Sequence, residues 1–343
     1  MRSIIRINII NLLIIFLIIG FAFSCKNREE NGEKIYTSSG IIAWPPVISP
    51  DGKWLSFVTF SVNDPFKITF INLQTNEIMS YPQEGDICSP TSWLADSSAV
   101  IFSISKVRDD RHLHLEFFLK KIIIKEKREL VVSKKYERML FSPAISKTGK
   151  IIFLEFMSQK ERVDGREYHY SNLWYLKKNM NAVKITEGLL SLFYGWIDDD
   201  ICFLRVKKEG NKTFWDLYLK KLDTGKEILL AEKVAPIYLL SDDQLFYFRL
   251  QNKKMELEKL SLKNFKKISF GTSKIMTDPA ISPDGSKIVF MRKNQVWVRA
   301  LSTGEEKQMT KTTDIKKYPL WTKDGKYIIY CTNQDLIKIK MDY

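Results

Sequence analysis

The chain has 343 residues, of which 45% are hydrophobic, and its formal net charge is +14 at pH 7. This length allows two domains or one large all-β unit with a sizeable core. The charge favours attraction to anionic surfaces, but glutamates interrupt even the densest basic run, residues 119–130, so we expect a solvated face and no nucleic-acid partner.

The first 24 residues predict an export signal. Arg2 and Arg6 precede an almost unbroken apolar run, residues 9–23, which is shorter than the roughly 20 residues of a stable membrane helix. A polar segment follows it, rather than the basic flank that stops transfer across a membrane. We therefore predict a signal peptide over residues 1–24. Its removal takes away two arginines and lowers the net charge of the protein from +14 to +12.

The junction between Ser24 and Cys25 resembles a bacterial lipoprotein signal, although Ala22 and Phe23 stand where Leu and a small residue are commonest. The resemblance implies a lipidated Cys25 at the mature N-terminus. It also implies an anchor in the outer membrane of the cell envelope, on the periplasmic or the surface face. A plain secreted protein and an uncleaved anchor are the alternatives. Residues 25–32 are then the lipidated cysteine and a charged tether.

The other three cysteines do not form a framework. Cys88, Cys202 and Cys331 are far apart in the sequence, and each lies among apolar neighbours. This pattern predicts buried free thiols rather than disulfides or a zinc site.

One hairpin pattern recurs seven times along the rest of the chain. Its clearest copies are VISPDGKWLSFVTF (47–60), AISPDGSKIVFMRK (280–293) and LWTKDGKYIIYCTN (320–333). The turn of each copy is marked by Asp51, Asp96, Thr148, Asp198, Asp242, Asp284 and Asp324. Successive markers are 40 to 52 residues apart, which is the range of β-propeller blades.

The chemistry of one unit explains the repeat. In the turn at 282–285, the ring of Pro283 fixes its own φ angle, and the Asp284 side chain can accept hydrogen bonds from nearby backbone N–H groups. Gly285 supplies the positive φ that the turn needs. The β-branched and aromatic strand at 287–292 follows, then an alternating strand and a short outer strand. We predict an all-β fold over residues 33–343: a seven-bladed propeller of four-stranded antiparallel blades.

The two ends of the repeat region predict how the ring closes. The last unit ends one strand short, at residues 335–343, whereas residues 33–40 match the outer strands of other units. We therefore expect the N-terminal strand to close the last blade. A six-bladed ring would require the units around Asp198 and Asp242 to merge.

The motifs at 49–57, 282–290 and 323–330 resemble the TolB-like propellers, the WD40-like Pro-Asp repeat family. The resemblance spans about 300 residues but is strong in three units, and it implies the fold rather than a function. TolB differs, because it has six blades and a preceding α/β domain. Its role is therefore not carried over.

A catalytic centre is not evident in the sequence. His112 and His114 lie two apart, with Glu116 on the same face and His169 as a third candidate, so a metal site like those of propeller lyases is one interpretation. Ordinary surface or interblade histidines are the other. The sequence has no GxSxG motif, and the turn aspartates are too far apart to cluster. We therefore expect no catalytic residues, no metal and no cofactor.

The loops that enter the innermost strands offer a binding surface at the mouth of the central channel. Their aromatic and charged residues suit peptides or acidic sugars. The candidate ligand-binding residues are Trp44, Tyr136, Arg138, Phe193, Tyr194, Asp278, Lys317 and Tyr318. Packing between blades is the alternative role for each aromatic residue.

Together these features predict a monomeric, lipid-anchored binding or scaffold module, with an envelope protein or an acidic glycan as its partner. The alternatives are a polysaccharide-active lyase or hydrolase of the propeller type and a surface-exposed adhesin.

Overall fold

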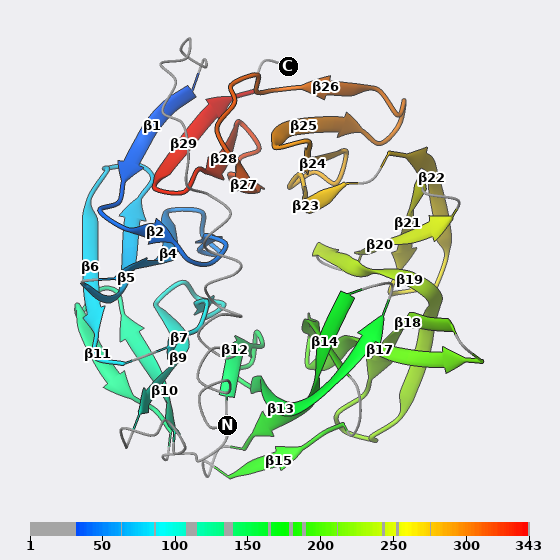
Figure 1. The fold of residues 1–343 in the computed structure, drawn as a ribbon, viewed down its shortest axis with the longest axis horizontal. Coiled ribbons are helices and arrows are strands. Elements are labelled where there is room, and N and C mark those ends of the chain that lie inside the picture. The colour runs from blue at the N-terminus through cyan, green and yellow to red at the C-terminus, as the bar shows by residue number, and fades with distance from the viewer. Residues whose placement is uncertain are drawn as a thin grey trace, which may run out of the picture.

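A computed structural model describes twelve ranges of the chain: residues 32–62, 64–85, 87–107, 115–133, 140–163, 166–177, 181–186, 190–210, 212–241, 244–251, 254–274 and 276–341. These residues form strands and turns around a ring (Figure 1). In these ranges no helix is long and apolar enough to cross a membrane.

The strands group into antiparallel units in which the chain runs from the inside of the ring outward (Figure 1). The first unit contains β2 (Ile41–Ile42), β3 (Val47–Ile48), β4 (Trp54–Ser61), β5 (Asp64–Asn72) and β6 (Ile78–Gln83). The second contains β7 (Ile87–Cys88), β8 (Ser92–Trp93), β9 (Ala99–Val107), β10 (Leu115–Ile123) and β11 (Arg128–Val131). In both units the innermost strand is broken into two short pieces.

The third unit contains β12 (Leu140–Ile145), β13 (Ile151–Val163), β14 (Arg166–Leu176) and β15 (Ala182–Lys184). A seven-stranded sheet follows, with β16 (Leu190–Ile197), β17 (Asp200–Glu209), β18 (Lys212–Lys220), β19 (Glu227–Ser241), β20 (Gln244–Gln251), β21 (Lys254–Ser261) and β22 (Lys267–Ser273). The first half of β19 pairs with β18 and its second half with β20. This sheet therefore holds a fourth and a fifth unit, joined by one continuous strand.

The last two units close the ring. The sixth contains β23 (Thr277–Ile281), β24 (Lys287–Arg292), β25 (Gln295–Ala300) and β26 (Glu306–Gln308). The seventh contains β27 (Lys317–Trp321), β28 (Tyr327–Cys331), β29 (Asp335–Lys340) and, as its outer strand, β1 (Gly32–Thr37). The all-β prediction is therefore confirmed, and so is the pairing of the N-terminal strand with the last strand of the chain (Figure 1).

Side chains alternate between the two faces of each strand, so every unit packs against both of its neighbours. On β20, Leu245 and Tyr247 join a cluster with the fourth unit, whereas Phe246 and Phe248 join a cluster with the sixth. Each of the seven hydrophobic clusters found among the described residues joins two consecutive units. The core is thus a circle of interfaces rather than one centre.

Indole groups connect the inner strands of consecutive units. The Nε1 atoms of Trp93, Trp196 and Trp321 donate to the backbone oxygens of Val47, Ala144 and Ala280 at 3.1, 3.0 and 3.2 Å. Each accepting residue directly follows a proline on the inner strand of the preceding unit. The bond therefore satisfies a carbonyl close to the place where proline interrupts the ladder.

The strand registers define two ends of the ring. At one end lie the hairpin turns after the inner strands, such as Ser282–Ser286, which we call the turn end. At the other end the inner strands begin, as at Thr277 and Lys317, which we call the bulge end. Gly32 pairs with Ile339, next to the turn at 322–326, so the chain enters β1 at the turn end.

Removal of β1 tests the closure of the ring. Ile35 and Tyr36 pack on the cluster between the seventh and first units, and Tyr36 meets Phe57 edge to face at 5.0 Å. A chain that begins at Ser38 should therefore be less stable to denaturant than one that begins at Gly32, by about 3 kcal/mol. Equal denaturation midpoints for the two proteins would show that β1 adds nothing to the ring.

Candidate functional site

Three inner strands begin with the same irregularity. Ser142, Asp278 and Tyr318 each precede a proline, and their φ angles are 45°, 47° and 55°. The pairing register of β12, β23 and β27 shifts at the same place. A residue other than glycine at positive φ costs about 1–3 kcal/mol and persists only where the surroundings fix it. Such strain at equivalent positions makes the bulge end the first place to look for function.

Two of these strands lie next to each other and bring charged groups together. The carboxylate of Asp278, on β23, lies near the backbone N–H of Tyr318, on the neighbouring strand β27, and the N–H lowers the pKa of the carboxyl. Beside it, Nζ of Lys317 donates to Oδ1 of Asn333 at 2.9 Å, and Lys317 pairs with Cys331 across the ladder. The structure thus gathers three of the predicted residues, Asp278, Lys317 and Tyr318, at one seam between the sixth and seventh units.

Burial shifts the titration of all three side chains. Desolvation raises the pKa of Asp278, although the N–H of Tyr318 and the charge of Lys317 oppose it. Asp278 as a whole is exposed to solvent, so the desolvation of its carboxylate is partial. Desolvation also lowers the pKa of Lys317. It raises the pKa of Tyr318 to about 12, with a further contribution from the Asp278 charge. Both ionic groups are therefore short of the solvation that a polar ligand would replace.

The other predicted ligand-binding residues have different outcomes. Trp44 is partly buried in the cluster between the first two units, and its Nε1 donates to the oxygen of Cys88 at 2.7 Å, so it takes part in packing. Phe193 and Tyr194 lie on β16, whose backbone alone is described there. Tyr136 and Arg138 lie outside the described residues.

Sequence reasoning missed two features of this site. One is Asn333, from the turn between β28 and β29, which holds the ammonium group of Lys317. The other is the strained residue before proline. The sequence did carry a signal for this feature, because in four units a proline stands five residues before the turn marker. These prolines are Pro46, Pro143, Pro279 and Pro319.

The turn end shows that the repeated aspartates shape hairpins. Asp284 Oδ1 accepts hydrogen bonds from Ser282 Oγ at 2.6 Å and from Ser286 N at 3.1 Å. These hydrogen bonds lower the pKa of Asp284 to about 2. Asp324 accepts Thr322 Oγ1 and Lys326 N in the same way, at 2.6 and 3.1 Å. The recurring Asp is therefore a turn former in these units, as its spacing predicted.

The structure tests the prediction of buried cysteines, whereas the histidines of the possible metal site are not described. Cys88, Cys202 and Cys331 are buried free thiols, as predicted, and burial raises the pKa of each. His112 and His114 lie outside the described residues, and the side chain of His169 is not described. Among the described residues, no three His, Cys, Asp or Glu side chains form a group that suits a metal ion.

Comparison with known proteins identifies the fold. A family model, the dipeptidyl peptidase IV N-terminal region, matches residues 223–318, which include Asp278, Lys317 and Tyr318. No curated protein matches the chain significantly.

Among solved structures, an oligogalacturonate lyase in complex with manganese is similar over 94% of this chain and 97% of its own, at 11% identity and a TM-score of 0.70. The propeller domain of the Trilobed protease from Pyrococcus furiosus is similar over 88% of this chain and 96% of its own, at 12% identity and a TM-score of 0.60. The chain therefore has a β-propeller fold. A TolB from Acinetobacter baumannii also matches, at 8% identity over 89% of this chain and 65% of its own, but its TM-score of 0.49 adds nothing.

Replacement of Asp278 by Asn tests the desolvated carboxylate. Because folding raises the pKa of this acid, its ionisation destabilises the fold as pH rises above the unfolded value near 3.8. Asp278→Asn should therefore stabilise the protein at pH 7 by about 0.5 kcal/mol, after allowance for solvent screening. The gain should disappear below pH 3.8 in thermal unfolding.

Asp324→Asn is the matched control, since the bonds from Thr322 and Lys326 lower the pKa of Asp324 overall despite its partial burial. This substitution should have the opposite sign and destabilise the protein at pH 7. If Asp278→Asn also destabilises the protein at pH 7, the carboxylate stabilises the fold and is not an incompletely solvated ligand-binding group.

Proposed function

We propose that this chain is an exported seven-bladed β-propeller, lipid-anchored at Cys25, that serves as a binding or scaffold module in the bacterial cell envelope. Its partner is an envelope protein or an acidic glycan, bound at the bulge end by Asp278, Lys317 and Tyr318. Seven blades are supported by the seven hydrophobic clusters, one for each pair of consecutive units.

The observation that carries this proposal is the seam between β23 and β27. The carboxylate of Asp278 and the ammonium group of Lys317 lie there with incomplete solvation, and the backbone of Asp278 and of Tyr318 is held at positive φ. Binding sites retain such local costs because a ligand recovers them. A glycan carboxylate or a peptide side chain would pair with Lys317, and the partner's N–H or O–H groups would donate to Asp278.

The place where the chain enters the ring supports this role. The chain enters β1 at the turn end, so an anchor that precedes residue 32 attaches there. The bulge end, with the proposed site, then faces away from the anchor and is accessible to a partner.

Photocrosslinking in cells tests the binding role. A photoreactive phenylalanine in place of Thr277, which is exposed beside Asp278, should give a discrete adduct whose partner mass spectrometry identifies. Val62, which is 90% exposed between β4 and β5 at the same end, is the matched control position. Lys317→Ala should weaken the adduct at position 277. Equal adducts at positions 277 and 62 would contradict the site.

A polysaccharide lyase is the second candidate, and the similarity in fold to an oligogalacturonate lyase along almost the whole chain favours it. Incubation of the full chain with oligogalacturonate and Mn²⁺ tests this activity, because eliminative cleavage leaves an unsaturated product that absorbs ultraviolet light. We expect no such product from the binding module. Turnover that is lost on addition of a chelator would favour the lyase.

A further inference from the structure

The turns between the third and fourth strands of the units share one backbone position that is occupied by different residue types. Five of these turns are described completely, and each holds a residue at positive φ near the same position: Asn76 (60°), Lys127 (50°), Gly225 (71°), Phe265 (56°) and Gly304 (74°). Glycine and asparagine suit this conformation, but a bulky aromatic residue does not. Phe265 is nonetheless there, and 49% of it is exposed to solvent. Neither local conformation nor core packing explains this choice.

Phe265 lines an apolar groove between the fourth and fifth units. The groove has a volume of about 450 Å³, and Ile228, Leu229 and Leu260 contribute its apolar lining together with Phe265. Leu229 is 44% exposed. Large apolar side chains that gather in one exposed groove indicate a surface that contacts another apolar phase.

The charges around the groove are predominantly positive. Lys226 and Lys267 line it, and the exposed Lys266 directly follows Phe265. Its one lining carboxylate, Glu227, accepts two bonds from Arg205, at 2.8 and 3.1 Å, and one from Lys220 at 3.0 Å. These partners offset the charge of Glu227. One further carboxylate, the exposed Asp223, lies nearby in the sequence, and the three lysines outnumber it.

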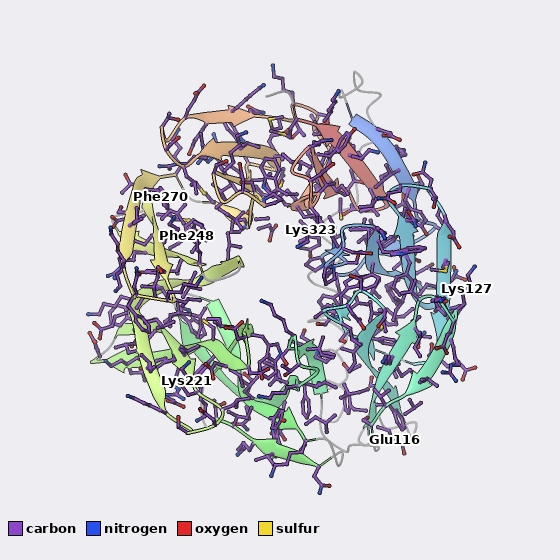
Figure 2. The ribbon with its side chains drawn as sticks, turned by 180° about the vertical axis from the view of Figure 1, so that it is seen from behind. Glu116, Lys127, Lys221, Phe248, Phe270 and Lys323 are labelled. Atoms are coloured by element: carbon purple, nitrogen blue, oxygen red, sulfur yellow. The ribbon has the colours of Figure 1, made fainter. Side chains whose placement is uncertain are left out.

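The groove lies near the turn end of the ring, the end from which an anchor would come. Phe265 lies in the turn that joins β21 to β22, and this turn, like the hairpin turns after the inner strands, belongs to the turn end. Gly32 enters the ring at the same end. In Figure 2, Lys323 of an inner turn lies beside the opening, whereas Lys127, from a turn between third and fourth strands, lies at the outer margin.

We propose that Phe265 and this groove dock onto the surface of an anionic phospholipid bilayer. The inference rests on the proposed membrane anchoring and adds a second contact to it. The phenyl ring and Leu229 enter the boundary between headgroups and acyl chains, while Lys226, Lys266 and Lys267 meet lipid phosphates. Docking at the turn end would orient the ring with its bulge end away from the membrane.

Amine footprinting of the full chain in vesicles tests this docking. The protein is reconstituted in phosphatidylcholine vesicles with or without phosphatidylglycerol, and acetylation of individual lysines is followed by mass spectrometry. Lys293, exposed in the turn between β24 and β25 at the bulge end, is the internal reference. We expect Lys266 and Lys267 to react about fivefold more slowly relative to Lys293 in anionic vesicles than in detergent.

Two glycine variants separate docking from stability. Phe265→Gly should keep or raise the thermal stability, because glycine suits the positive φ, yet it should abolish most of the protection. Asn76→Gly changes the equivalent turn of the first unit and should leave the protection intact. Unchanged protection in Phe265→Gly, equal protection on neutral vesicles, or none in the wild-type protein would each overturn the proposal. Flotation of the same vesicles reports separately whether the chain is anchored.

Discussion

The pairing of β1 with β29 is the contact on which the ring depends. It joins the beginning of the described chain to its end, and the ion pairs Lys34–Asp335 (3.2 Å) and Glu33–Lys338 (2.8 Å) lie along it. Every unit is apolar on both faces and cannot be stable alone, so an open ring would expose two faces at once. Closure removes both exposed faces.

Closure also explains how local strain at the bulge end is maintained. A proline interrupts the inner strand, and the residue before it adopts a positive φ in at least three units. The carbonyl after the proline is then bound by a tryptophan of the next unit, as in the bond from Trp321 to Ala280. The fourth and seventh units therefore hold the distortion of the third and sixth, which a separate hairpin would relax. The same seam brings Asp278 to Tyr318.

The two ends of the ring have different chemistry for a topological reason. Strands alternate in direction, so all hairpins that follow inner strands meet at one end and all entries to inner strands meet at the other. The turn end carries self-contained Asp hairpins, the incoming chain and the apolar groove at Phe265. The bulge end carries the incompletely solvated Asp278 and Lys317. The proposed tether and the proposed ligand would therefore lie at opposite ends of the ring.

The repeat itself predicted the all-β fold, the turn role of Asp284 and the strand at 33–40 that closes the last unit, because these depend on local propensity and on counting strands. The sequence likewise predicted buried free thiols from their apolar neighbours. The tertiary structure decided that Trp44 packs between units and that Asn333 holds Lys317. It also decided that Asp278 meets Tyr318, some forty residues away in the sequence. Contacts across a seam depend on how two units rotate against each other, and no local pattern encodes that rotation.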